Sequence, residues 1–209
     1  MMDVLGRTAA FLISHVHGTF FLFLLFGALG CVPMTSAPPS VPIPQAYGHE
    51  FGGALHGGAG VHRGVSEPLT NLQMWYRDRT DFIDGQETGA IMQVGFPAGV
   101  SAGGYWRDSF ELESENVAMG PQLEVGLLWI GAGLPMAFRL GEGHWVTSQP
   151  SFRLSMFSLI HVPVGYSWQV SQDLRLDLET GVHALAPSHK QVLQYPVHVY
   201  GSLGLSSQW

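Results

Sequence analysis

Two short acidic stretches hold the residues best suited to bind a cation. They read DRTDFIDGQE from residue 78 and RDSFELESEN from residue 107. Carboxylate oxygens clustered in loops could hold Ca²⁺ or Mg²⁺, including ions that bridge the phosphates of lipopolysaccharide. A pair of solvated, mutually repelling loops accounts for the same residues, and no EF-hand spacing points to a specific metal. The candidate cation-loop residues are Asp81, Asp84, Glu87, Asp108, Glu111, Glu113 and Glu115.

A second set of polar residues alternates with apolar ones, which suggests one sheltered face. Because an unpaired buried charge is costly, we expect arginines and carboxylates on such a face to pair into a network. We expect the histidines there to occupy space in the interior and to form hydrogen bonds. His161, His183 and His198 could also meet across strands as a metal or acid–base site. The charged members are Glu124, Arg153, Arg175, Asp177 and Glu179, and the histidines also include His56.

Motifs for catalysis and cofactor binding are missing from the sequence. There is no G-x-S-x-G nucleophile elbow and no G-x-G-x-x-G motif between a strand and a helix. The single Cys excludes a Cys-based zinc cage, and a formal net charge of -7 argues against nucleic-acid binding. We therefore expect no enzyme activity, no cofactor and no nucleic-acid partner.

The elements that carry these residues are predicted to be β-strands. In residues 152–170 the even positions are mostly apolar and the odd positions are mostly polar or small. The same period of two recurs in 50–61, 122–130, 174–184 and 197–209, and no comparably long segment has helical spacing. With turn residues at 97–99, 131–133, 141–143 and 172–173, the pattern predicts an all-β body.

Composition indicates which face of these strands meets water. Charged residues make up 12% of the chain, whereas a soluble domain usually has about 25%. No charged residue falls on the apolar face of the alternating segments. Aromatic residues gather near segment ends, as expected for the girdles at the two membrane interfaces. They are Trp75, Tyr76, Tyr105, Trp106, Trp129, Tyr166, Trp168 and Trp209. We therefore predict that the apolar face points outward into lipid and that the polar face lines a narrow lumen. The alternative is a soluble lipocalin-like barrel whose apolar face points inward.

A sheet in lipid must close, because an open edge would leave backbone N–H and C=O groups without partners. Residues 48–209 predict an antiparallel, up-and-down, closed transmembrane β-barrel of about eight strands, within a range of eight to ten. This pattern resembles the eight-stranded outer-membrane barrels of the OmpA and OmpX kind. The final residues, YGSLGLSSQW, are similar to the C-terminal signal that such barrels present to the barrel-assembly machinery, except at Ser207, where an apolar residue is usual.

The first 47 residues indicate export. Residues 20–30, FFLFLLFGALG, form an uncharged run of signal-peptide length that is too short for a transmembrane helix. The segment GALGC resembles the lipobox of bacterial lipoproteins, which implies acylation of the Cys31 thiol. Five prolines in residues 32–46 predict an extended tether. The expected organisation is a signal peptide (1–30), a lipid-anchor cysteine with a Pro-rich linker (31–47) and a barrel domain (48–209).

These expectations define a location better than an activity. We predict an exported lipoprotein barrel in a Gram-negative outer membrane, with a structural or surface-interaction role and with membrane lipid and lipopolysaccharide as partners. One alternative is a soluble periplasmic lipoprotein whose barrel binds an apolar ligand. Another is an outer-membrane lipid-modifying enzyme with Ser, His and an acid on the outer face. The sequence predicts no oligomeric state.

Overall fold

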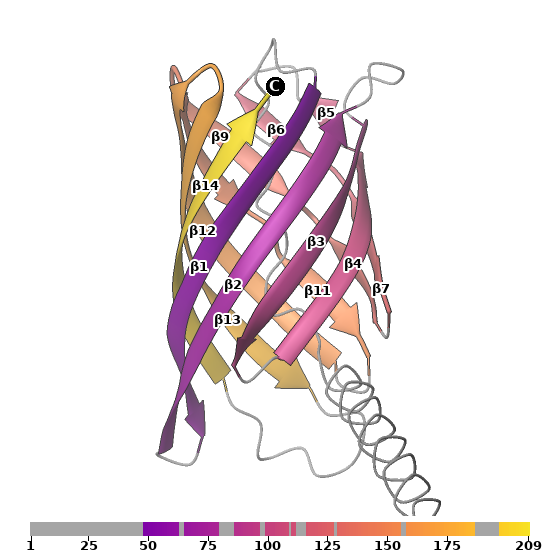
Figure 1. Cartoon of the computed structure of the whole chain (residues 1–209), viewed down its shortest axis with the longest axis vertical. Helices are drawn as coiled ribbons and strands as arrows, with labels where there is room; N and C mark the ends of the chain where they lie inside the picture. Colours follow the sequence, from indigo (N-terminus) through magenta and orange to yellow (C-terminus); the bar gives the residue numbers. More distant parts are fainter. Residues whose placement is uncertain are drawn as a thin grey trace, which may run out of the picture.

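A computed structural model shows a barrel of tilted antiparallel strands (Figure 1). It describes residues 48–62, 65–79, 86–96, 99–108, 110–111, 116–127, 129–155, 158–186 and 197–209. No helix long and apolar enough to cross a membrane occurs among these residues. The predicted signal peptide and linker lie outside the described residues and stay predictions.

Fourteen strands are found in the described residues. They are β1 (Gly48–His62), β2 (Val65–Arg79), β3 (Gln86–Phe96), β4 (Gly99–Asp108), β5 (Phe110–Glu111), β6 (Val117–Met119), β7 (Gln122–Gly126), β8 (Ile130–Gly133), β9 (Met136–Gly141), β10 (His144–Ser148), β11 (Ser151–Leu154), β12 (Ser158–Ser171), β13 (Leu174–Ala186) and β14 (Val197–Gln208).

The strands occupy ten positions around the wall. Four consecutive pairs, β4–β5, β6–β7, β8–β9 and β10–β11, each follow a single line along it. The sheet closes within the described residues because β1 pairs with β14 and because β12 pairs with both β10 and β11. The prediction of an all-β, closed antiparallel barrel is confirmed. The expected count of about eight strands is wrong, since ten positions lie at the upper end of the predicted range.

Two sequence features explain the undercount. The alternation over 152–170 continues past Leu154, but the chain reverses before Ser158 and forms the antiparallel pair β11–β12. Residues 131–133 form a strand, β8, rather than the expected turn. Gly131 is small for a packing reason, since a Cβ there would lie 2.9 Å from Cγ of Arg153.

Three prolines divide long wall strands into shorter ones. Pro121 lies between β6 and β7, Pro135 between β8 and β9, and Pro150 between β10 and β11. Proline has no N–H to donate, so it interrupts the ladder. Each carbonyl still accepts a bond from the neighbouring strand, and these donors are the N–H groups of Asp108 (3.1 Å), Gly120 (3.2 Å) and Leu134 (2.9 Å).

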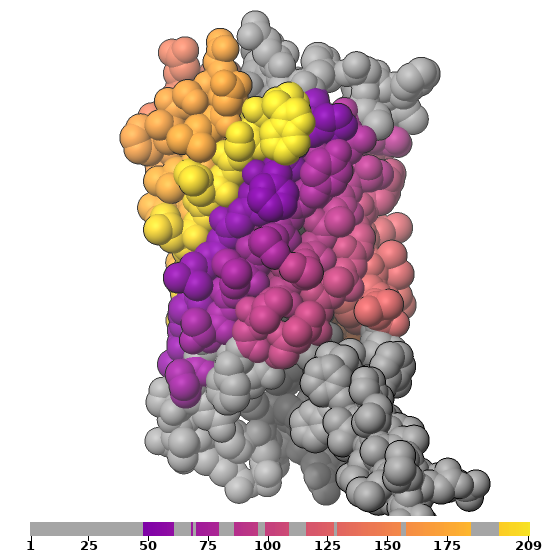
Figure 2. All heavy atoms as spheres, in the orientation of Figure 1, coloured from indigo at the N-terminus to yellow at the C-terminus, as the bar shows by residue number. Residues whose placement is uncertain are grey.

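The outer face of the wall is apolar and the inner face is polar. Leu55, at the middle of β1, is 60% exposed, and Leu203 opposite it is 55% exposed. Figure 2 shows the side chains of β14, β1, β2 and β3 in diagonal bands across the face in view. Among the described side chains of the strands, the charged residues on the outer face are Asp78 and Asp108, near strand ends. The predicted orientation, with aliphatic side chains outward and ionic ones inward, is the one that the structure has.

Strand stagger sets the tilt of the barrel. The register row that starts at Arg79 on β2 returns to β2 at Glu67, twelve residues away, after one circuit. The row in between passes through Glu87, Arg107, Gln122, Gly133, Ser151, His161, His183, His198 and Gly60. A stagger larger than the number of strands tilts the strands strongly against the barrel axis.

The two rims of the barrel are distinguished by the position of the first and last residues of the domain. Gly48 and Trp209 lie together, since Trp209 N donates to His49 O at 3.0 Å. We call this end the terminal rim and the opposite end, where β13 ends and β14 begins, the far rim. Both termini of the barrel domain thus leave from one side (Figure 1).

Several aromatic residues expected in membrane girdles instead point inward. Trp75, Tyr105 and Trp129 are 5% exposed or less. Trp75 covers Gly52 on the neighbouring strand, where no side chain competes for the space. By contrast Tyr76, Trp168 and Trp209 are exposed on the outer face.

Candidate functional site

Glu50, near the start of β1, gathers three arginines inside the terminal rim. Its carboxylate oxygens lie 3.2 Å from Arg77 Nη2, 3.9 Å from Arg79 Nη2 and 3.0 Å from Arg175 Nη2. Trp75 Nε1 donates to the same carboxylate at 3.1 Å. Charge-assisted hydrogen bonds are about twice as strong as neutral ones. Glu50 therefore ties together β1, β2 and β13 from within.

Glu87, on β3, is the second centre of this group. Its carboxylate oxygens lie 3.7 Å from Arg77 Nη1, 3.6 Å from Arg79 Nε and 3.2 Å from Arg107 Nη1. Tyr105 donates its hydroxyl proton to Glu87 Oε1 at 3.0 Å. The two glutamates share Arg77 and Arg79. We call the two glutamates and the four arginines that contact them the ionic cluster: Glu50, Glu87, Arg77, Arg79, Arg107 and Arg175.

The five charged residues predicted for the lumen lie on the inner face. Arg153 binds Glu124 at two points, with Nε 2.6 Å from Oε2 and Nη2 3.2 Å from Oε1. Arg175 Nε lies 3.0 Å from Asp177 Oδ2, and Ser167 donates to the other oxygen of Asp177. Arg175 belongs to the ionic cluster as well, so these residues extend it toward the middle of the barrel.

Several members of the ionic cluster are not among the candidates named from the sequence. Glu50, Arg77 and Arg107 are each 2% exposed or less. The sequence does contain a signal for these three residues. Each is adjacent to an aromatic residue, and because adjacent side chains of a strand point to opposite faces, an outward aromatic residue places its charged neighbour inside. Those neighbours are Phe51, Tyr76 and Trp106.

The expectation that Glu87 belongs to a surface cation loop is wrong. Glu87 is 3% exposed and contacts arginines inside the wall, because β3 begins at Gln86 and the next residue already points inward. Asp108 is half-buried at the end of β4, and Glu111 lies in β5 with a side chain outside the described part. Asp81, Asp84, Glu113 and Glu115 lie outside the described residues. Their connections leave from the terminal rim, and their use as a cation site stays a prediction.

A layer of imidazoles lies inside the barrel toward the far rim. His161 on β12 lies opposite His183 on β13, which lies opposite His198 on β14. The rings of His161 and His183 are stacked, with centroids 4.6 Å apart and planes inclined by 8°. Tyr200 packs against this pair, 4.5 Å from His183 and 5.7 Å from His161, and His56 lies 5.8 Å from it. We call these five residues the histidine layer; each is 2% exposed or less.

Hydrogen bonds connect part of this layer into a chain. Tyr200 donates its hydroxyl proton to Glu179 Oε1 at 2.5 Å. His161 Nε2 lies 2.6 Å from the hydroxyl oxygen of Tyr200. Because the Tyr200 hydroxyl gives its own proton to the bond with Glu179, His161 Nε2 is the donor in this second bond. Both ring nitrogens of His183 are buried without a hydrogen-bond partner among the described residues. Glu179 likewise forms no ion pair with any described residue, which sets it apart from the lumen carboxylates Glu124 and Asp177.

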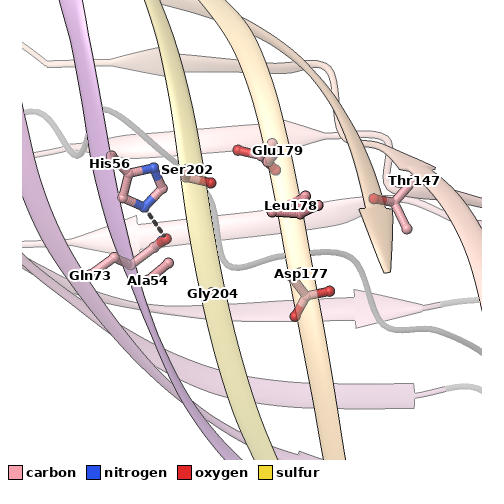
Figure 3. A pocket seen from close by; sticks show the side chains of 9 residues that line it. All are labelled: Ala54, His56, Gln73, Thr147, Asp177, Leu178, Glu179, Ser202 and Gly204. Carbon is pink, nitrogen blue, oxygen red and sulfur yellow. Dashed lines mark hydrogen bonds between the residues drawn. The ribbon is translucent and has the colours of Figure 1, made fainter. Parts of the chain in front are cut away.

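A small cavity lies inside the barrel beside His56 of the histidine layer (Figure 3). Its volume of about 10 Å³ is room for roughly one water molecule. His56 Nε2 is 3.0 Å from Gln73 Oε1 at its edge, as the dashed line in Figure 3 marks. The other lining residues are Ala54, Thr147, Asp177, Leu178, Glu179, Ser202 and Gly204.

The described side chains of the interior form hydrogen bonds and ion pairs with one another. No three His, Cys, Asp or Glu side chains of the described ranges are placed to hold a metal ion. Ser151 Oγ lies 3.4 Å from His161 Nδ1, which is long for a nucleophile and its base, and the other nitrogen of His161 is bound to Tyr200. The arrangement is suited to keep a polar lumen filled and its strands tied together.

One His–acid pair lies on the outer face. His49 Nδ1 is 3.4 Å from Asp78 Oδ1 and 2.7 Å from the hydroxyl of Tyr76, near the terminal rim. A lipid-modifying enzyme would need a serine beside this pair. No contact between a serine and His49 is seen in the part of the chain that the structure describes.

No family model and no curated protein matches this sequence. Solved structures similar to the chain include the NanC porin, with 10% identity, 77% of this chain and 100% of that chain covered and a TM-score of 0.47. The KdgM porin has 6% identity, 75% and 99% coverage and a TM-score of 0.45. Ail, the attachment invasion locus protein of Yersinia pestis, has 11% identity, 78% and 99% coverage and a TM-score of 0.37. The fold assignment for this chain rests on its own strand register.

Proposed function

We propose that this protein is an exported outer-membrane β-barrel with a structural or surface-interaction role. The observation that carries the proposal is the apolar belt on the outer face. One register row crosses the wall through outward residues only: Val100, Val94, Leu72, Leu55, Leu203, Leu178, Tyr166, Val146, Phe138 and Val117. An apolar surface of this extent is unusual for a soluble monomer and marks a surface that another apolar phase covers.

Closure and charge placement support the same proposal. Every wall position pairs on both sides, which is what a hydrocarbon environment requires of backbone N–H and C=O groups. The buried arginines are paired with carboxylates inside, as at Arg153 and Glu124. We infer that polar side chains plug the lumen, and the small volume of the cavity in Figure 3 supports this inference.

The soluble alternative is less consistent with the structure. A barrel that binds an apolar ligand would need aliphatic side chains around its lumen and polar ones outside. Here the inner face carries residues such as Gln73, Arg107 and His183, each 1% exposed or less, and the outer face is aliphatic. The enzyme alternative lacks a described nucleophile beside His49 and Asp78.

We further propose that Cys31 carries the lipid anchor and that membrane lipid and lipopolysaccharide are the partners of the barrel. What supports this is the lipobox-like segment and the Pro-rich tether, which joins the barrel at the terminal rim next to Gly48. At about 3.1 Å per residue in extended form, a tether of this length lets the anchor reach the membrane surface nearest the terminal rim.

Carbonate extraction of membranes and mobility on SDS gels test the membrane proposal. A barrel inserted in the outer membrane stays in the carbonate pellet and migrates differently before and after heating. Recovery of the protein in the carbonate supernatant, with a mobility that heating does not change, would overturn the proposal.

A further inference from the structure

We propose that the histidine layer is an acid-sensitive plug of the lumen. Its side chains pack closed while the imidazoles are neutral, and they separate when the imidazoles are protonated, which opens the far half of the barrel to small ions. The inference goes beyond the proposed location, because it assigns a regulated conductance to the interior.

The geometry of His161 and His183 is the first support. Their rings are stacked 4.6 Å apart and nearly parallel, on strands that pair directly. Such a stack is favourable between neutral rings. Two protonated rings at this distance repel each other, and the burial of both side chains leaves little water to screen the charge.

The described charges around the stacked pair His161 and His183 balance no more than one added proton. The pair meets His56 from β1, Ser151 and Arg153 from β11, Glu179 from β13, and His198 and Tyr200 from β14. On β2, Glu67 shares the register row, and its side chain lies outside the described part. Glu124 balances the charge of Arg153, and the Glu179 carboxylate accepts a hydrogen bond from the Tyr200 hydroxyl without losing its charge. Among the described charges, Glu179 can therefore balance one added proton, and protonation of both His161 and His183 leaves an excess of positive charge.

The unpartnered nitrogens of His183 show where the layer would open first. The side chain is 0% exposed, and neither ring nitrogen has a hydrogen-bond partner in the described structure. A protonated ring needs two acceptors, so water must enter or the side chain must swing away. The cross-strand bonds of β12 and β13 hold the backbone, which leaves motion of the side chains into the lumen as the available response.

Conductance of the purified full-length protein in planar bilayers, with KCl as the probe, tests this inference. We expect mean conductance to rise about tenfold as the pH falls from 7 to 4, because imidazoles that are buried without acceptors take up a proton only in acid. His183→Phe keeps the aromatic packing, loses no described hydrogen bond and should abolish most of the rise. The matched control is His144→Phe, a histidine on the outer face that stacks on Trp168, and it should keep the rise.

A second measurement does not depend on a variant or on a bilayer. In detergent, NMR titration of the wild-type imidazoles reports the protonation that opens the layer. We expect their chemical shifts to change over the pH range of the conductance rise, while amide hydrogen exchange of β13 and β14, corrected for intrinsic rates, stays the same. Conductance that is independent of pH, a rise retained in His183→Phe, or layer imidazoles that stay neutral while the barrel conducts would each overturn the plug. Failure of carbonate retention would instead overturn the membrane proposal.

Discussion

Arg175 on β13 binds Glu50 on β1 at two points, with Nη2 3.0 Å from Oε1 and Nη1 3.3 Å from Oε2, although 125 residues separate them in sequence. β14 lies between these strands, and its Gln208 donates to the same carboxylate at 3.0 Å. The ion pair therefore spans the seam at which the first and last strands close the barrel.

Removing the Glu50 carboxylate should destabilise the barrel strongly. Glu50→Gln leaves Arg77 and Arg175 buried with one carboxylate fewer, and breaking a buried ion pair in this way costs about 3–5 kcal/mol of unfolding free energy. Urea unfolding in detergent, followed by tryptophan fluorescence, measures the change. Asp78→Asn is the matched control, because Asp78 is 38% exposed and its pairing should be worth about 1 kcal/mol or less. Equal losses of unfolding free energy in the two variants would contradict the proposal that the ionic cluster holds the first and last strands together.

A charge on the outer face should be tolerated according to its height. Leu55, at the middle of β1, and Leu140, near the terminal rim on β9, are 60% and 65% exposed. In a bilayer Leu55→Arg should cost about 2–4 kcal/mol and Leu140→Arg about 0–1 kcal/mol. Unfolding from lipid vesicles measures both. In a barrel surrounded by water the two variants would behave alike, so a difference near zero would argue against lipid contact.

Packing of aromatic rings over glycines predicts a third result. A Cβ at Gly52 would lie 2.2 Å from Cζ2 of Trp75, so Gly52→Ala forces the ring or the backbone to shift and should cost about 1–3 kcal/mol. Gly57 has no atom within 4 Å of its would-be Cβ. Gly57→Ala should therefore change the unfolding free energy by no more than about 0.5 kcal/mol. If Gly52→Ala were as well tolerated, Trp75 would not hold the position described above.

Replacement of Cys31 separates the barrel from its proposed anchor. Cys31→Ser removes the thiol that acylation needs, while the apolar belt of the barrel is unchanged. We expect the variant to lose metabolic labelling by palmitate and to remain in the carbonate pellet. Release of the variant into the soluble fraction would show that the acyl chain, and not the barrel, holds the protein at the membrane.

The inward or outward direction of most side chains is readable from the sequence alone. Strand side chains alternate with a period of two, so Leu203 and Leu205 had to share one face and Tyr200 and Ser202 the other. The low share of charged residues then decides which face can meet lipid. The same parity misleads at Trp129, which the alternation assigns to the apolar face and which is 4% exposed inside the barrel, because the chain turns between Gly126 and Trp129.

Partners inside the barrel were decided only by the tertiary structure. Which arginine meets Glu87, and whether His161, His183 and His198 stand at one height, depends on the number of strands and on their stagger around a closed wall. Neither quantity is local: the reversal after Leu154 adds a strand to the wall while it leaves the period of two intact. Alternation therefore determines the face of a residue, and closure determines its neighbours.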